Sequence, residues 1–329
     1  MQNKTILINF LRIVFLVFVL ISIFFTYSIL KPLPLKENII FEIKKGHGFN
    51  QLVDELNEKN LIEYPILMKT YGKLTRRASK VHAGEYEISQ NDSVVSLVNN
   101  MFEGKIFYRQ LRLKEGSSFK ELLETLIDNP YLSKGLEVKN IDLIRKHLKI
   151  SYQSLEGLFY PDTYFFKKGD STLSLLKRAH LKHNEVLEEV WNSRSIGLPY
   201  QSSYEALILA SIIEKEGIEK RQIAGVFIRR LKTKMKLQSD PTIIFALGDE
   251  YSGDIKNSHI KMKDPYNTYH IYGLPPGPIG LVSQSSIEAA LNPEQGDSLF
   301  FVSKGDGTHH FSDTLEEHNK AVKKFQLNK

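Results

Sequence analysis

A carboxylate at the end of a long apolar run is the residue of this chain best suited to acid–base chemistry. Glu214 directly follows residues 206–213, one of the most apolar runs outside the N-terminus. Burial disfavours the charged form of a carboxylate, so we expect the pKa of Glu214 to be raised toward the range in which it can donate a proton near neutral pH. Glu214 is therefore a candidate general acid. The alternative from these residues alone is a buried structural carboxylate paired to a distant arginine or lysine.

The helix that must position Glu214 also predicts which charges surround it, because residues three and four apart are neighbours on a helix. Glu216 has Lys220 at i+4 and is expected to form an ordinary exposed ion pair. The nearest cation along the stripe of Glu214 is Arg221, nearly two turns away. No local charge is therefore expected to neutralise Glu214.

Polar and aromatic side chains gather in three segments downstream. Residues 234–242 follow an apolar and basic helix predicted over 223–231, and residues 264–269 and 272–279 are rich in Pro, Gly and aromatic residues. Proline fixes φ and glycine permits unusual φ, so this region is predicted to be stiff and sharply shaped. Stiff loops with Tyr, Asn and Thr suit sugars, which need flat apolar faces and directional hydrogen bonds. A long connection held down by prolines explains the same pattern equally well.

The C-terminal histidines do not predict a metal site. Residues 307–313, Glu317 and His318 contain possible ligands, but no pair has the HExxH spacing, and adjacent histidines in a strand point to opposite faces. Thr314 and Glu317 instead fit a capping box that opens the last helix. No phosphate loop or dinucleotide fingerprint is present, so no cofactor is expected.

An uncharged apolar stretch over residues 13–30 is at the lower limit of the ~20 residues that span a bilayer. A cleaved signal peptide would have a shorter apolar region followed by a small-x-small site, and residues 28–34 offer no convincing one. We therefore expect a retained single-pass anchor. Basic residues flank both of its ends, so charge does not set its orientation; a short tail with a large domain outside is the usual arrangement.

Composition bounds the class of protein. The 329 residues leave room for two or three domains after the anchor, and 42% hydrophobic and 25% charged residues are globular values. The net charge of +6 suits an anionic partner, such as a headgroup surface or an acidic polymer; nucleic acid is not expected for an anchored chain without a recognition motif. The absence of cysteine excludes disulfides, thiolate nucleophiles and zinc ribbons.

Three short βα units are predicted between the anchor and residue 130. Residues 43–53 align without gaps with residues 113–123, and residues 88–98 keep the same spacing. Each unit opens with strand-type residues, turns at Gly or Asn and enters an amphipathic helix. The predicted helix caps are Gly48, Ser93 and Ser118. Modules of this shape resemble the LysM-like fold of wall-binding domains, and the alternative is a spacer.

Six ordered motifs cover nearly the whole chain. They lie at residues 155–164, 210–216, 237–242, 266–269, 273–279 and 289–293. Together they resemble the MltG (YceG-like) family of endolytic murein transglycosylases. The resemblance implies that the glutamate of the Ala-Ser-Ile-x-Glu-Lys-Glu motif, here Glu214, is catalytic. Gly217 departs from the family pattern, and the helix is expected to end or bend there.

The resemblance also implies an organisation and a location. It implies an α+β protein with a cytoplasmic tail and single transmembrane anchor (1–35), a LysM-like βα repeat region (36–130) and a mixed α+β YceG-like catalytic domain (131–329). The protein is expected in the cell inner (plasma) membrane, with the catalytic domain on the extracytoplasmic side. Its expected partners are peptidoglycan glycan strands and the membrane-embedded machinery of cell-wall synthesis.

The implied activity is cleavage of the MurNAc–GlcNAc β-1,4 bond within glycan strands, with formation of 1,6-anhydro-MurNAc ends and termination of nascent strands. The candidate sugar-binding residues are Gln238, Ser239, Asp240, Tyr266, Asn267 and Tyr269. His309 matches a family histidine and is expected to support the fold. Two alternatives remain open: a hydrolase with a second carboxylate from Asp240, Asp264 or Glu156, and a non-catalytic anchored wall-binding protein.

Overall fold

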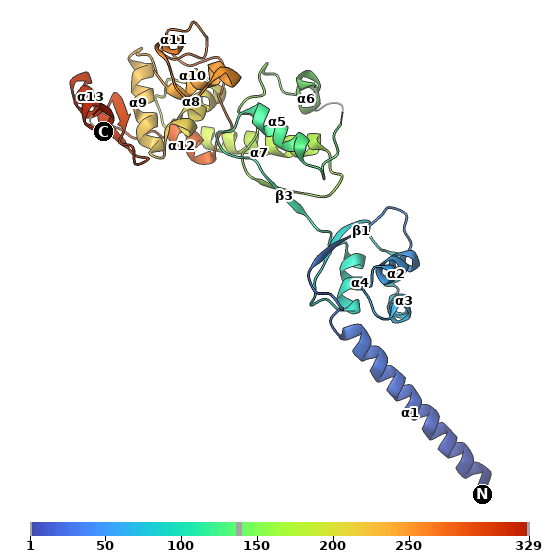
Figure 1. Cartoon of the computed structure of the whole chain (residues 1–329). Helices are drawn as coiled ribbons and strands as arrows, with labels where there is room; N and C mark the ends of the chain where they lie inside the picture. Colours follow the sequence, from blue (N-terminus) through green and yellow to red (C-terminus); the bar gives the residue numbers. More distant parts are fainter. Residues whose placement is uncertain (1, 136–139, 328–329) are drawn as a thin grey trace. The chain divides into compact units, whose positions relative to one another are not determined.

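The computed structural model describes residues 2–135 and 140–327 and has a mixed α+β architecture (Figure 1). The chain divides into two compact units. Unit 1 comprises Met1–Arg109 and Phe165–Lys168, and unit 2 comprises Gln110–Tyr164 and Gly169–Lys329. The domain boundaries expected from the sequence, after residues 35 and 130, stay predictions.

The elements follow one another as short strands and mostly short helices. Those of unit 1 are α1 (Gln2–Leu30), β1 (Ile39–Ile43), α2 (Phe49–Glu58), α3 (Pro65–Leu74), β2 (Gly84–Ile88) and α4 (Val94–Glu103). Strand β3 (Arg109–Arg112) pairs with β4 (Thr163–Phe166). The remaining elements are α5 (Phe119–Asp128), α6 (Ile141–Leu148), α7 (Thr172–Asn192), α8 (Ser203–Glu216), α9 (Lys220–Lys232), α10 (Asp240–Leu247), α11 (Asn257–Ile260), α12 (Gln284–Leu291), β5 (Phe300–Ser303), β6 (His309–Ser312) and α13 (Leu315–Val322).

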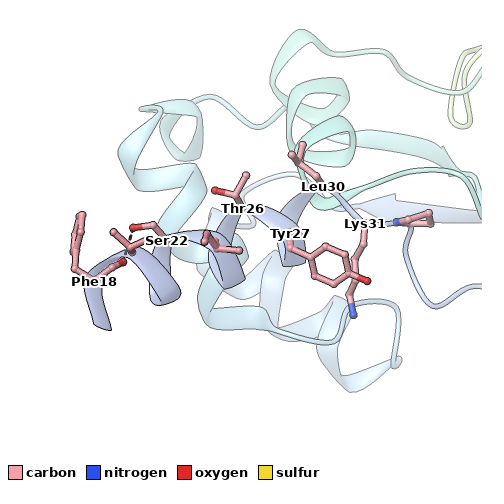
Figure 2. Close-up of a pocket in the computed structure, with 9 residues that line it drawn as sticks. Phe18, Ser22, Thr26, Tyr27, Leu30 and Lys31 are labelled. Carbon is pink, nitrogen blue, oxygen red and sulfur yellow. Dashed lines mark hydrogen bonds between the residues drawn. The ribbon is translucent and has the colours of Figure 1, made fainter. Parts of the chain in front are cut away.

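Helix α1 is long and apolar enough to cross a membrane. Its 27 residues from Lys4 to Leu30 include an 18-residue window with a mean hydropathy of 2.8. The Ser22 hydroxyl donates a hydrogen bond to the Phe18 carbonyl at 2.8 Å, which satisfies this polar group within the helix, as an apolar surrounding requires. Ser22 and Thr26 lie one turn apart and border a cavity of about 760 Å³ along the helix (Figure 2). The predicted apolar helix is confirmed, and it is longer than residues 13–30.

The predicted βα units are confirmed as local structure. Strands β1 and β2 pair antiparallel, with Ile39 opposite Ile88 and Ile43 opposite Gly84. Alternate strand residues and one face each of α2 and α4 are buried in the core of unit 1. Ser93 and Ser118 accept from the backbone N–H groups three residues on, and both form capping boxes. The third pair, β3 and α5, falls mostly in unit 2, so only the first two share a core.

Helix α8 lies at the centre of unit 2. All eight residues from Ala206 to Ile213 are at most 4% exposed, because α7, α9, α10 and α12 pack around it. Figure 1 shows α8 among α9, α10 and α12. A helix surrounded by other helices has no need of a polar face, which explains why Ser211 is the one polar residue between Ala206 and Ile213. The charged residues of α8 are therefore confined to its ends, and three of them form its last turn, residues 214–216.

The end of α8 is fixed by a glycine, as predicted. Gly217 caps the helix with φ 173° and ψ −171°, an extended conformation that stops the helical path. A Cβ atom at this position would lie 2.5 Å from Cε1 of His309, so only glycine leaves room for that ring. Further on, the predicted capping box of Thr314 and Glu317 is confirmed at the start of α13.

Candidate active site

The last turn of α8 places Glu214 in a tight set of hydrogen-bond donors. The side chain of Glu214 is only 6% exposed. Its Oε1 accepts from Nζ of Lys220 at 2.9 Å, and its Oε2 accepts from the backbone N–H of Ser283 at 2.9 Å and from the Ser283 hydroxyl at 2.5 Å. The carboxylate is thus held from two sides, by α9 and by the residue that precedes α12.

These partners arise from the chain reversal at Gly217 and from the start of α12. Because α8 stops there, α9 begins at Lys220 in a new direction and carries its ammonium back to Glu214. Ser283 is the N-cap of α12, where backbone N–H groups have no partner within the helix and the helix dipole is positive. An acidic side chain is stabilised in such a position.

The expectation of a raised pKa for Glu214 is wrong. Burial raises the pKa, but the hydrogen bonds from Ser283, Ser286 and Lys220 together outweigh it and hold the pKa below its ordinary value. The expected pairing of Lys220 with Glu216 is also wrong, since Lys220 pairs with Glu214. The i+4 rule applies only within one helix, and the helix ends between these residues.

Two loops pack beside Glu214. The N–H of Gly116 donates to the Leu281 carbonyl at 2.8 Å, and the N–H of Leu281 donates to the Ser117 carbonyl at 2.8 Å. Gly116 has φ +70°, and a Cβ there would lie 3.9 Å from Cγ of Glu214. A Cβ at Gly280 would lie 2.7 Å from the Gly116 carbonyl oxygen, so this close approach of two backbones requires glycine.

A second buried carboxyl anchors one of these loops. Glu156 is 8% exposed, and its two oxygens accept from the N–H of Phe119 at 2.9 and 3.1 Å, at the start of α5. Burial raises the pKa of Glu156 to about 7, although the Phe119 N–H and the charge of Lys215 act in the opposite direction. Glu156 thus has the environment that the sequence predicted for Glu214.

Glu216 faces a different set of residues from Glu214. Its Oε1 accepts a short hydrogen bond from the Ser239 hydroxyl. Burial raises the pKa of Glu216 to about 7; the Ser239 hydrogen bond lowers it, and nearby Asp240 raises it further. The prediction of an exposed ion pair is wrong for this residue, because the segment that precedes α10 covers it.

Three of the predicted sugar-binding residues share a cavity with Glu216. Gln238, Asp240 and Tyr269 line this space of about 520 Å³. The Tyr269 hydroxyl donates to Oδ1 of Asp240 at 2.6 Å. Ser239 is buried behind them and bonded to Glu216. This group is therefore organised around the second glutamate of the motif.

Asn267 and Tyr266 lie apart from that cavity lining. Asn267 is fully buried, and its Nδ2 donates to the carbonyls of His259, Ile260 and Met262 at 3.2, 3.1 and 2.8 Å. Its amide therefore fixes the loop after α11. Tyr266 is half-buried against Phe245, and its hydroxyl lies 3.0 Å from where a Cβ of Gly277 would be.

Lys220 and Ser283 are neighbours of Glu214 that were not expected from the sequence. Lys220 lines a cavity of about 920 Å³ together with Gln284 and Ser285. Ser283 directly precedes Gln284 in the chain. Lys220 Nζ donates to the Ser285 hydroxyl at 3.0 Å as well. The available signals were a serine directly before residues 284–291, which form α12, and a lysine just after a helix-ending glycine.

Fold and site define an α+β protein with an N-terminal apolar helix and a glutamate-bearing central helix. Residues 41–324 match the model of the YceG-like family, and the chain belongs to that family. It is 30% identical over 323 residues to an endolytic murein transglycosylase of Bacillus subtilis, covering 91% of this chain and 88% of that protein.

Two further comparisons agree with this assignment. An endolytic murein transglycosylase of Streptococcus pneumoniae strain D39 is 25% identical over 324 residues, covering 87% of this chain and 58% of its own length. The crystal structure of a yceG-like protein from Listeria monocytogenes superposes with a TM-score of 0.53 at 30% identity, covering 87% of this chain and all of that one.

Proposed function

We propose that this chain is a membrane-anchored endolytic lytic transglycosylase that cleaves the MurNAc–GlcNAc β-1,4 bond within peptidoglycan strands, with Glu214 as its acid and base. The observation that carries the proposal is the position of Glu214, whose side chain is only 6% exposed and is held by the starts of α9 and α12. The chain is also 30% identical to a Bacillus subtilis protein named endolytic murein transglycosylase. The location of Glu214 at the end of the central helix α8 gives it a fixed position, as a catalytic group needs.

The reaction needs one carboxyl group in two successive roles. Protonated Glu214 gives its proton to the glycosidic oxygen while positive charge develops at C1 of MurNAc. The resulting carboxylate accepts the proton of the C6 hydroxyl of the same sugar, whose oxygen bonds to C1 and closes the 1,6-anhydro ring. No water is consumed. Because the nucleophile belongs to the substrate, no second carboxylate is required.

The polar residues grouped around Glu216 are proposed to hold one stretch of the glycan, apart from the stretch that meets Lys220 and Glu214. Gln238, Asp240 and Tyr269 offer hydrogen-bonding groups at the surface of one cavity. Ser239 and Asn267 are proposed to contribute by shaping the segments that carry them, since both are buried. Tyr266 offers an aromatic face and a hydroxyl beside the Gly277 turn.

Helix α1 is proposed to anchor the chain in the inner membrane as a single span, with both units outside the cytoplasm. Its length and apolar composition support the anchoring. The βα units of unit 1 are proposed to be LysM-like and to add affinity for the wall. Action near the membrane would let the enzyme terminate nascent strands beside the synthesis machinery.

A second candidate function is hydrolysis by two carboxylates. The observation in its favour is Glu216, whose pKa of about 7 suits a proton donor and which lines a cavity together with Asp240. In that case water attacks C1, and the products have hydrated reducing ends.

Matched variants on the same helix turn separate these functions. Full-length protein in detergent is incubated with purified peptidoglycan, and product masses are measured for wild type, Glu214→Gln and Glu216→Gln. We expect anhydro ends, one water lighter than hydrolytic ends, from wild type and Glu216→Gln and none from Glu214→Gln. Hydrated ends that disappear in Glu216→Gln would establish the hydrolase instead. Binding without any product would favour an anchored wall-binding protein.

A further inference from the structure

The hydrogen bonds around Glu214 suit a carboxylate, whereas a general acid must carry a proton when it meets the glycosidic oxygen. Lys220 and Ser283 together direct three donor groups at its two oxygens. They hold the pKa of Glu214 below its ordinary value despite burial. Under the proposed function, on which this inference rests, a donor must leave before proton transfer.

Lys220 is the donor able to leave. The Ser283 N–H is fixed by the start of α12, and Ser283 is 6% exposed. The Lys220 side chain is 19% exposed and has a flexible four-carbon stem. Its ammonium has other acceptors within reach, because Nζ lies 2.9 Å from the Ser283 hydroxyl and 3.0 Å from the Ser285 hydroxyl. A small movement toward Ser285 would break its contact with Glu214.

The side to which Lys220 can move opens into a cavity. Lys220, Gln284 and Ser285 line the space of about 920 Å³, and both Gln284 and Ser285 are exposed. The other charged residues that line it are Glu189, Glu219, Arg221, Glu288 and Glu294. Within residues 2–135 and 140–327, Lys220 is the one charged group hydrogen-bonded to Glu214. The start of α12 donates hydrogen bonds to Glu214 from hydroxyl and N–H groups. The Gly116 backbone packs beside the Glu214 side chain.

We propose that Lys220 is a positioning residue that switches Glu214 between an ionised resting form and a protonated working form. In the resting form the ammonium holds the carboxylate. When a glycan strand enters the cavity, an oxygen of the sugar accepts the hydrogen bonds of Lys220 and draws it away from Glu214. The carboxylate then takes one proton from solvent, gives it to the glycosidic oxygen and regains one from the C6 hydroxyl. The protonated carboxyl that results releases its proton to solvent, and Lys220 can then hold the carboxylate again.

The test compares pH profiles of kcat/KM for glycan cleavage by full-length wild type, Lys220→Met and Lys220→Arg, because kcat/KM reports the pKa of the free enzyme, in which Lys220 still holds Glu214. Since the protonated carboxyl is the active form, cleavage declines as pH rises through its pKa. An opposite charge at hydrogen-bond distance lowers a carboxyl pKa by roughly 1–3 units, so in Lys220→Met the decline should move to higher pH by about that much. KM should also rise, because the contact with the sugar oxygen is lost. Lys220→Arg should restore both properties.

The matched control is Lys320→Met, which removes a lysine from an exposed ion pair with Glu316 on α13. Its profile should equal that of wild type. NMR titration of Glu214, assigned with Glu214→Gln, gives a readout independent of turnover. Equal titration of Glu214 in wild type and Lys220→Met would overturn the switch, and an unchanged KM would overturn the glycan contact. If wild type cleaves nothing while the titration still shifts, the proposed function fails and the Lys220 coupling stands.

Discussion

Replacing Glu156 by glutamine should remove a specific part of the pH dependence of stability. The carboxyl is 8% exposed, and both of its oxygens contact the N–H of Phe119. Glutamine has nearly the same volume and keeps one carbonyl oxygen for that N–H, but it does not titrate. The variant therefore tests the electrostatic effect of burial with little change in packing.

The sign and the magnitude follow from the raised pKa of Glu156. Burial raises it from 4.5 to about 7, so between these pH values the folded protein keeps a proton that the unfolded chain releases. The stabilisation is fully present below the pKa of Glu156 in the unfolded chain. It is lost as pH rises through the pKa of Glu156 in the folded protein. At 1.36 kcal/mol per pKa unit, the free energy of unfolding should fall by about 3 kcal/mol over this range because of Glu156.

The assay is chemical denaturation of the full-length protein at several pH values, with the unfolding of unit 2 followed. Trp191 on α7 is the single tryptophan of the chain, so its fluorescence reports on that unit. Glu156→Gln should show a fall in stability between pH 5 and pH 7 that is smaller than that of wild type by about 2–3 kcal/mol. The exposed Glu316→Gln serves as the control and should follow wild type. Equal pH dependence of wild type and Glu156→Gln would refute the reasoning.

Two further substitutions test structural roles near the site. Asn267→Ala leaves three carbonyls without their common donor and should lower the free energy of unfolding by about 1–3 kcal/mol in the same assay; unchanged stability with weaker peptidoglycan binding would instead indicate direct sugar contact. Gly217→Ala places a Cβ 2.5 Å from the His309 ring and should destabilise unit 2 by about 1–3 kcal/mol, and wild-type stability would show that the ring moves aside without strain.

Local structure was largely predictable from the sequence. The apolar helix α1, the βα units with caps at Ser93 and Ser118, the end of α8 at Gly217 and the capping box of α13 all depend on residues a few positions apart. Such features follow from the periodicity, capping and backbone preferences of short segments. The family followed from six ordered motifs and agrees with the family match over residues 41–324.

The electrostatics of the candidate site were predicted incorrectly because they depend on residues distant in the sequence. Ser283 is 69 positions from Glu214, and its N–H and hydroxyl act together with Ser286 and Lys220 to outweigh the effect of burial on the pKa of that glutamate. Likewise Glu156 meets Phe119 across 37 positions. No spacing rule relates such pairs, since only the packing of separate helices brings them together.

The sequence by itself determined the apolar central helix, the position at which it ends and the presence of two glutamates there. It could not determine which glutamate would be ionised. That was decided by tertiary structure: the reversal at Gly217 brings Lys220 to Glu214, and the segment before α10 covers Glu216 with Ser239. The charge state of a carboxyl depends on its surrounding donors and on its burial, and both are properties of the packed chain.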